Sequence, residues 1–116
     1  MAELYLISID DGVEVVELMI PQMLDSQEFD SLNIGLLKLL EGRAKPRWVL
    51  ELSNVPYAGS ALLGLMVNVR HRIKAGGGKL ILCGLSPILT DIFLTSSLER
   101  LFTIVRDRTS AVRELQ

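Results

Sequence analysis

The sequence has few of the residues from which catalytic and metal centres are usually built. It contains one cysteine and one histidine, so it can form no intrachain disulfide and offers no cluster of soft ligands for a metal ion. Its apolar runs fall short of the roughly 18 residues that a membrane span needs, and the start, Met1-Ala2-Glu3, lacks the basic region of a signal peptide. These absences predict a cytoplasmic protein with no cofactor, no metal and no membrane contact.

Charge of one sign is not in excess either. Twelve basic and fourteen acidic residues give a net charge of −2, whereas nucleic-acid-binding domains usually gather a basic excess on one face. The balance therefore argues against nucleic acid as a partner. Hydrophobic residues make up 49% of the chain and charged residues 22%, which is typical of a globular protein. The length of 116 residues suits one domain over residues 1–116.

The apolar pattern predicts strands and helices that alternate after an initial hairpin. Strands are predicted over Leu4–Ile9, Val13–Leu18, Trp48–Leu52, Lys79–Cys83 and Leu101–Val105. Helices are predicted from Asp25 to just before Gly42, over Ser60–Ala75, from Ser86-Pro87 onward, and over Thr109–Leu115. This order predicts an α/β domain with a mixed sheet of four to five strands, an N-terminal β-hairpin and about four helices packed on the sheet.

Short-range signals place the helix starts and the buried faces. Asp25 followed by Glu28 has the spacing of a capping box, and Ser86 followed by Pro87 is typical of an N-cap and a first helical residue. Cys83 lies in an apolar run and is interpreted as a core residue, because a free cysteine behaves as a small hydrophobe. The helical side chains expected to face the core are Phe29, Leu32, Leu36, Leu40, Leu62, Met66, Val69, Ile73, Ile88, Leu89, Ile92 and Phe93.

Three other features have ordinary interpretations. The Gly-Gly-Gly-Lys run at residues 76–79 lacks the spacing of a phosphate-binding P-loop and is interpreted as a flexible turn. His71 lies among basic residues on the polar side of a helix and is interpreted as a surface residue. The acidic pair Asp10-Asp11 precedes Gly12 and is typical of a turn. With no nucleophile beside a base and no cofactor loop, the sequence predicts a protein that is not an enzyme.

Ser60 has two interpretations from local chemistry. It follows a buried strand, at the edge where α/β sheets usually place their sites, and it opens a helix whose free amide groups and dipole would stabilise a phosphate. The residues from Ala61 to Met66 are all apolar or glycine and span more than one turn, so part of this apolar surface is expected to be exposed. Ser60 is therefore either an ordinary helix cap or a covalent switch beside a partner surface.

The stretch from Leu50 to Gly64 resembles the signature of STAS domains, the family of bacterial anti-sigma-factor antagonists. The family pattern is a buried strand followed by Asp-Ser-Ser/Thr-Gly-Leu-Gly, and the resemblance continues through residues 76–87 and 94–102, so it covers nearly the whole chain. Ser60 falls on the phosphoacceptor serine of that pattern. Three neighbours depart from it, since Gly59, Ala61 and Leu62 replace the aspartate, the second hydroxyl residue and the glycine.

The resemblance implies a regulatory module without catalysis of its own. Such a domain binds an anti-sigma factor that is also a serine kinase, is ejected when the kinase phosphorylates the serine, and is reset by a PPM-type serine phosphatase. A phosphate on Ser60 would act through the desolvation cost that a charge imposes on an apolar contact. The residues expected to contact the partner are Asp25, Tyr57, Ala58, Gly59, Ser60, Ala61, Leu62 and Leu63.

Two alternatives stay open at this point. The turn at Gly59 leaves room and two neighbouring amide groups for a small anion or a nucleotide phosphate, which predicts a ligand sensor. The chain can also be a scaffold that is not phosphorylated and works as a homodimer or larger homo-oligomer.

Overall fold

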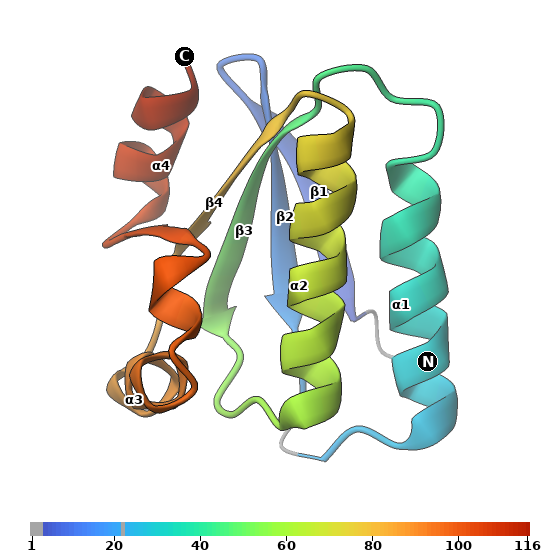
Figure 1. Cartoon of the computed structure of the whole chain (residues 1–116), viewed down its shortest axis with the longest axis vertical. Coiled ribbons are helices and arrows are strands. Elements are labelled where there is room, and N and C mark those ends of the chain that lie inside the picture. Colours follow the sequence, from blue (N-terminus) through green and yellow to red (C-terminus); the bar gives the residue numbers. More distant parts are fainter. Residues whose placement is uncertain (1–3, 22) are drawn as a thin grey trace.

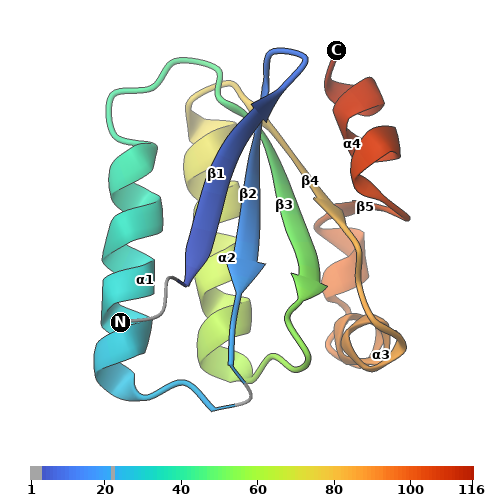
Figure 2. The same cartoon turned by 180° about the vertical axis from the view of Figure 1, so that it is seen from behind.

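Five strands lie side by side in the order in which they occur along the chain, in a computed structural model that describes residues 4–21 and 23–116 (Figures 1 and 2). The strands are β1 (Tyr5–Asp10), β2 (Val13–Met19), β3 (Arg47–Asn54), β4 (Lys79–Cys83) and β5 (Thr103–Val105). The pair β1 and β2 is antiparallel and every later pair is parallel. The predicted mixed sheet with an N-terminal hairpin is confirmed. Residues 1–3, on which the signal-peptide argument was based, lie outside the described residues.

The hairpin turn is set by two residues. Asp10 pairs with Val13, and the intervening Asp11 and Gly12 have φ values of 50° and 81°. Two successive positive φ values define a type I′ turn, whose twist matches that of the strands on either side. The Asp-Asp-Gly sequence is therefore a turn, as predicted.

Four α-helices and one short 3₁₀ helix accompany the sheet. They are α1 (Ser26–Leu39), α2 (Ser60–Ala75), α3 (Pro87–Thr95), η1 (Leu98–Arg100) and α4 (Arg108–Leu115). Helices α1 and α2 cover one face of the sheet, α4 covers part of the other face, and α3 lies beyond one end of the strands (Figures 1 and 2). The strand predicted from Leu101 begins only at Thr103, because Leu101 still closes the turn of η1.

The core has two parts, one on each face of the sheet. Alternate residues of β3 point to opposite faces, so Trp48 and Leu50 join the larger cluster under α1 and α2, while Val49 joins the smaller cluster under α4. The predicted buried stripe of α2 is confirmed by Leu62, Met66, Val69 and Ile73, none more than 4% exposed. Cys83 belongs to the smaller cluster and is also fully buried, as predicted.

For one residue of α3, the prediction that it faces the core is wrong. Leu89 and Phe93 are buried, but Ile88 is 61% exposed. Successive helical residues are about 100° apart, so Ile88 points away when Leu89 faces inward. Because α3 lies at the end of the sheet and not across its face, the neighbouring strands cover only one side of the helix.

Two features lie at the end of the sheet opposite to Ser60. Trp48, near the start of β3, is fully buried, and within the described residues its indole N–H has no hydrogen-bond acceptor. The glycine turn between α2 and β4 is closely packed, since a Cβ on Gly78 would collide with the carbonyl oxygen of Pro46. Residues 76–78 are therefore a turn, as predicted, and the turn is closely packed where the sequence suggested a flexible one.

Candidate functional site

Ser60 is the first residue of α2 and not its cap. The backbone is still extended at Gly59, with φ −83° and ψ −178°, and Gly59 is the N-cap. A capping side chain must sit at that extended position to reach the free amides of the next residues. Within the described residues no side chain caps α2, so the first of the two interpretations of Ser60, an ordinary helix cap, is wrong. Its side chain is exposed to solvent.

Backbone N–H groups at the start of α2 have no hydrogen-bond acceptor within the helix. The first backbone bond of the helix runs from the Leu63 N–H to the Gly59 carbonyl, at 3.0 Å, which leaves the earlier amides of the turn without helical acceptors. The first turn contains no acidic residue. The positive end of the helix dipole is therefore not offset within the helix itself, and a negative group on Ser60 would be stabilised there.

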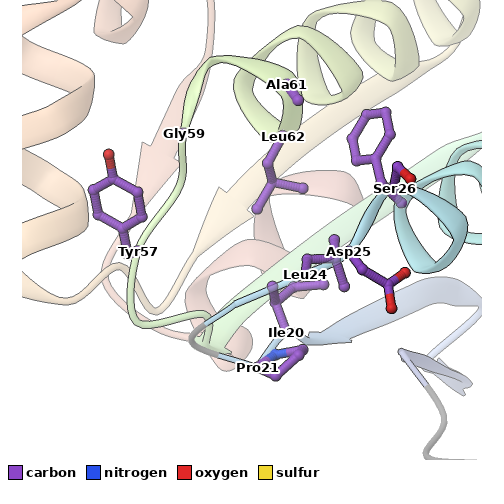
Figure 3. A pocket seen from close by; sticks show the side chains of 10 residues that line it. Ile20, Pro21, Leu24, Asp25, Ser26, Tyr57, Gly59, Ala61 and Leu62 are labelled. Carbon is purple, nitrogen blue, oxygen red and sulfur yellow. The ribbon is translucent and has the colours of Figure 1, made fainter.

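A hollow of about 410 Å³ lies beside this turn, and we call it the turn hollow (Figure 3). It is bounded by the end of β2, the start of α1 and the start of α2. Its lining, mostly apolar, consists of Ile20, Pro21, Leu24, Asp25, Ser26, Phe29, Tyr57, Gly59, Ala61 and Leu62. Leu62 reaches toward Ile20 and Leu24 from the opposite wall (Figure 3). An apolar concavity therefore lies beside the exposed Ser60 hydroxyl, and exposed apolar surface of this kind often marks an interaction site.

Asp25 comes to the turn hollow from a distant part of the chain. It is the N-cap of α1, where its carboxylate accepts the Glu28 N–H at 2.7 Å, while the Glu28 carboxylate accepts the Asp25 N–H at 3.2 Å. The predicted capping box is confirmed. The cap fixes where the Asp25 carboxylate stands, and the fold thereby places one acidic side chain in the lining of a mostly apolar hollow.

The other residues predicted to contact a partner differ in exposure. Tyr57 is 56% exposed, whereas Ala58 is 2% exposed and belongs to the core. Ala61 is exposed, Leu63 is half-buried, and Leu62 is buried but lines the turn hollow. Tyr57 and Ala61 are therefore exposed to solvent, as Ser60 is, and their contact with a partner stays a prediction.

A second hollow, not predicted from the sequence, lies on the other side of Tyr57. This α3 hollow measures about 350 Å³ and is lined by Tyr57, Ile88, Asp91, Ile92, Thr95 and Ser96. One signal for it was present in the sequence. Helix α3 has nine residues, and its large apolar side chains are too many for one buried side, so some had to face solvent.

Cys83 and His71 lie outside the lining of the two hollows. Burial raises the pKa of the Cys83 thiol to about 12, with the nearby Glu51 carboxylate adding to the effect, so the thiol stays protonated and unreactive. His71 is exposed, as predicted. Within residues 4–21 and 23–116, no group of histidine, cysteine, aspartate or glutamate side chains is placed to hold a metal ion. None of the helices in that part of the chain is long and apolar enough to cross a membrane.

The chain matches known proteins over almost its whole length. The family model described as STAS domain matches residues 7–111. An anti-sigma-factor antagonist (STAS) domain protein from Planctomyces limnophilus superimposes with a TM-score of 0.83 at 20% identity, over 96% of this chain and 97% of that one. A variant of RsbS from Moorella thermoacetica gives a TM-score of 0.77 at 19% identity, over 96% and 93%.

A third solved structure has a lower but clear similarity. It is the Bacillus cell-fate determinant SpoIIAA in its phosphorylated form, with a TM-score of 0.68 at 15% identity, over 97% of this chain and 99% of that one. At such identities the likeness establishes the fold. The resemblance inferred from residues 50–64, 76–87 and 94–102 is confirmed by these matches.

Proposed function

The chain belongs to the STAS domain family, and we propose that it acts as an anti-sigma-factor antagonist in the bacterial cytoplasm. In this proposal it binds an anti-sigma factor through the surface around Ser60 and performs no catalysis. The observation that carries the proposal is the exposed Ser60 hydroxyl, one residue inside an uncapped helix start and beside the apolar turn hollow.

Phosphorylation of Ser60 would switch this binding off. The anti-sigma factor, acting as a serine kinase, would transfer a phosphate of about −2 charge to a position where free amides stabilise it. The partner would then have to desolvate that charge to keep its apolar side chains in the turn hollow, which is costly. A PPM-type phosphatase would restore the binding form. In support, SpoIIAA has this fold and is known in a phosphorylated form.

Titration of the chain with the anti-sigma-factor kinase from the same genome tests the proposal. By isothermal calorimetry we expect Ser60→Ala to bind within about twofold of wild type, and Ser60→Asp to bind at least about 100-fold more weakly, or about 2.7 kcal/mol. Mass spectrometry after incubation with ATP should find the phosphate on Ser60. Thr109→Asp, which adds a carboxylate to the exposed first turn of α4, is the matched control. Equal affinities of the two Ser60 variants would remove the switch.

The free amides of α2 favour one second function, the sensing of a small anion. Inorganic phosphate or a nucleotide would then bind at Gly59 and Ser60 and raise the melting temperature. A thermal-shift series with phosphate, ATP and GTP tests this function, and an unchanged melting temperature across the series would exclude it. Ser60→Asp should reduce any shift, because its carboxylate occupies the same positive helix end.

A further inference from the structure

We propose that the docking surface continues from the turn hollow across Tyr57 onto α3, and that it recognises a partner segment whose apolar side chains are flanked by lysine or arginine. The inference rests on the proposed function and specifies the chemistry of the partner. Three observations support it: a shared wall between two hollows, the acidic residues in their lining, and the mixed charge of the hollows at the opposite end of the molecule.

The two hollows are adjacent because Tyr57 lines both of them. Tyr57 is 56% exposed, and Ile88 on the far side of it is 61% exposed. An exposed tyrosine between two apolar concavities resembles the centre of protein interfaces, where aromatic residues surrounded by apolar pockets supply much of the binding energy. The partner is therefore expected to insert apolar side chains on both sides of the Tyr57 ring.

The charge beside these hollows is of one sign. Asp25 borders the turn hollow and Asp91 borders the α3 hollow, while the described lining of both contains no lysine, arginine or histidine. Glu28 stands next to Asp25 in the capping box. Among the described residues, the ion pairs of the protein involve none of these three carboxylates. A cation of a partner can therefore pair with them without breaking an existing ion pair.

The opposite end of the molecule carries charges of both signs. Lys45, Arg47 and Lys79 line a hollow beside Gly77 and Gly78 together with Glu114, and an adjoining hollow is lined by Asp10, Asp11 and Arg113. The two hollows beside Tyr57 differ from these because the only charged residues in their described lining are acidic. Complementary charge steers and orients association, so cationic flanks of a partner favour the hollows beside Tyr57.

Cationic flanks on the partner are compatible with a phosphate that ejects it. Ser60 stands between Gly59 and Ala61, which both line the turn hollow, so a phosphate on it would lie beside the apolar centre of the docked segment. The carboxylates of Asp25 and Asp91 stand at the two outer sides. Salt screens exposed rim charges, but it does not remove the desolvation cost of a charge at the apolar centre. The two effects therefore differ in their dependence on salt.

A pair of synthetic peptides of about 18 residues, long enough to form a helix, serves as the probe. Both have the same leucine face, and they carry either lysine or glutamate beside it. In amide correlation NMR we expect the lysine peptide to shift the signals of Tyr57, Ser60 and Ile88, and the glutamate peptide to leave them in place. Equal binding of the two peptides, or shifts centred on Lys45 and Lys79, would overturn the proposal.

Matched variants locate the contacts by fluorescence anisotropy of the labelled lysine peptide. Ile88→Asn should raise its Kd about 5- to 10-fold, or about 1–1.4 kcal/mol, whereas Leu94→Asn, on the same helix and 55% exposed, should change it less than about twofold. Asp25→Asn removes the charge but keeps a good helix cap, and Asp30→Asn is its exposed control. A Leu94 effect as large as the Ile88 effect would contradict the proposed surface.

The dependence on salt separates this inference from the proposed function. At low salt Asp25→Asn should weaken peptide binding about fivefold, and the difference from wild type should disappear near 0.5 M salt, where the screening length is only about 4 Å. The loss of kinase binding in Ser60→Asp should persist at that salt. If Ser60→Asp binds the kinase as tightly as wild type while the lysine peptide is still preferred, the proposed switch is wrong and the cationic partner stands. If Asp25→Asn weakens peptide binding equally at low and high salt, the cationic partner is wrong and the switch stands.

Discussion

Two serines stand at the starts of neighbouring helices, and the fold uses them in different ways. Ser86 is the N-cap of α3, its hydroxyl accepts the Leu89 N–H at 3.1 Å, and Pro87 follows at the first helical position. Ser60 is one position further into its helix, after Gly59, and caps nothing. One residue of offset therefore separates a hydroxyl that stabilises the fold from a hydroxyl that is left exposed to solvent.

The largest expected change in the free energy of unfolding is for substitution of Ser86, the serine that caps a helix. Ser86→Ala should lower the free energy of unfolding by about 1 kcal/mol, because the Leu89 amide loses its acceptor at the helix start. Urea denaturation followed by circular dichroism measures it. Ser86→Asp, which preserves an acceptor at the N-cap, should recover most of the loss. If the urea midpoint of Ser86→Ala equals that of wild type, the Ser86 hydroxyl does not stabilise the fold and the two serines do not differ in this respect.

A cap can also be added to the helix that lacks one. Gly59→Asp should raise the free energy of unfolding by about 0.6 kcal/mol, a few tenths from the side-chain cap and a few tenths from the dipole. The backbone at Gly59 is extended, and the nearest atom to an added Cβ, in the Tyr57 ring, lies 3.8 Å away. The same urea titration, with Gly59→Ala as the non-capping control, checks it. A loss of stability would mean that the turn requires glycine.

A smaller gain is expected from a negative charge on Ser60 itself. Ser60→Asp should raise the free energy of unfolding by about 0.4 kcal/mol at low ionic strength, through the helix dipole, and the gain should fade as salt is added. Thermal unfolding at two salt concentrations measures both the gain in stability and its loss when salt is added. Lower stability at low salt would show that Ser60→Asp weakens binding through damage to the fold, and would remove its value as a phosphate mimic.

The smallest effect is expected where the hydroxyl is simply removed. Ser60→Ala should change the free energy of unfolding by no more than about 0.3 kcal/mol, inside the range of exposed substitutions, because the hydroxyl caps nothing. Urea denaturation beside Ser86→Ala provides the direct comparison. A loss near that of Ser86→Ala would show that Ser60 contributes to the fold after all.

Local sequence signals predicted most of the fold because they act over three or four residues. The Asp25 capping box and the Ser86-Pro87 helix start are both found where the spacing placed them. The cap of α2 was misplaced by one residue, since glycine and serine are both acceptable N-caps. The choice between Gly59 and Ser60 depends on where the chain leaving β3 turns into the helix, and that path is set by packing.

Local sequence signals predicted only part of the candidate site. The exposed turn at Ser60 follows from the order of strand and helix, but the turn hollow joins it to Asp25 through tertiary packing alone. The α3 hollow was missed for a different reason. Ile88, Leu89, Ile92 and Phe93 are all apolar, so a helical period cannot tell which of them face solvent.

The burial of Trp48 gives the protein an internal spectroscopic reporter. It is the only tryptophan, it is fully enclosed, and it lies near the beginning of β3, whereas Ser60 follows the strand's far end. Its fluorescence should shift to longer wavelength when the core opens and stay constant when a ligand without tryptophan docks at the Ser60 end. Emission from a single unlabelled side chain can thus monitor, in one cuvette, whether a variant that has lost binding is still folded.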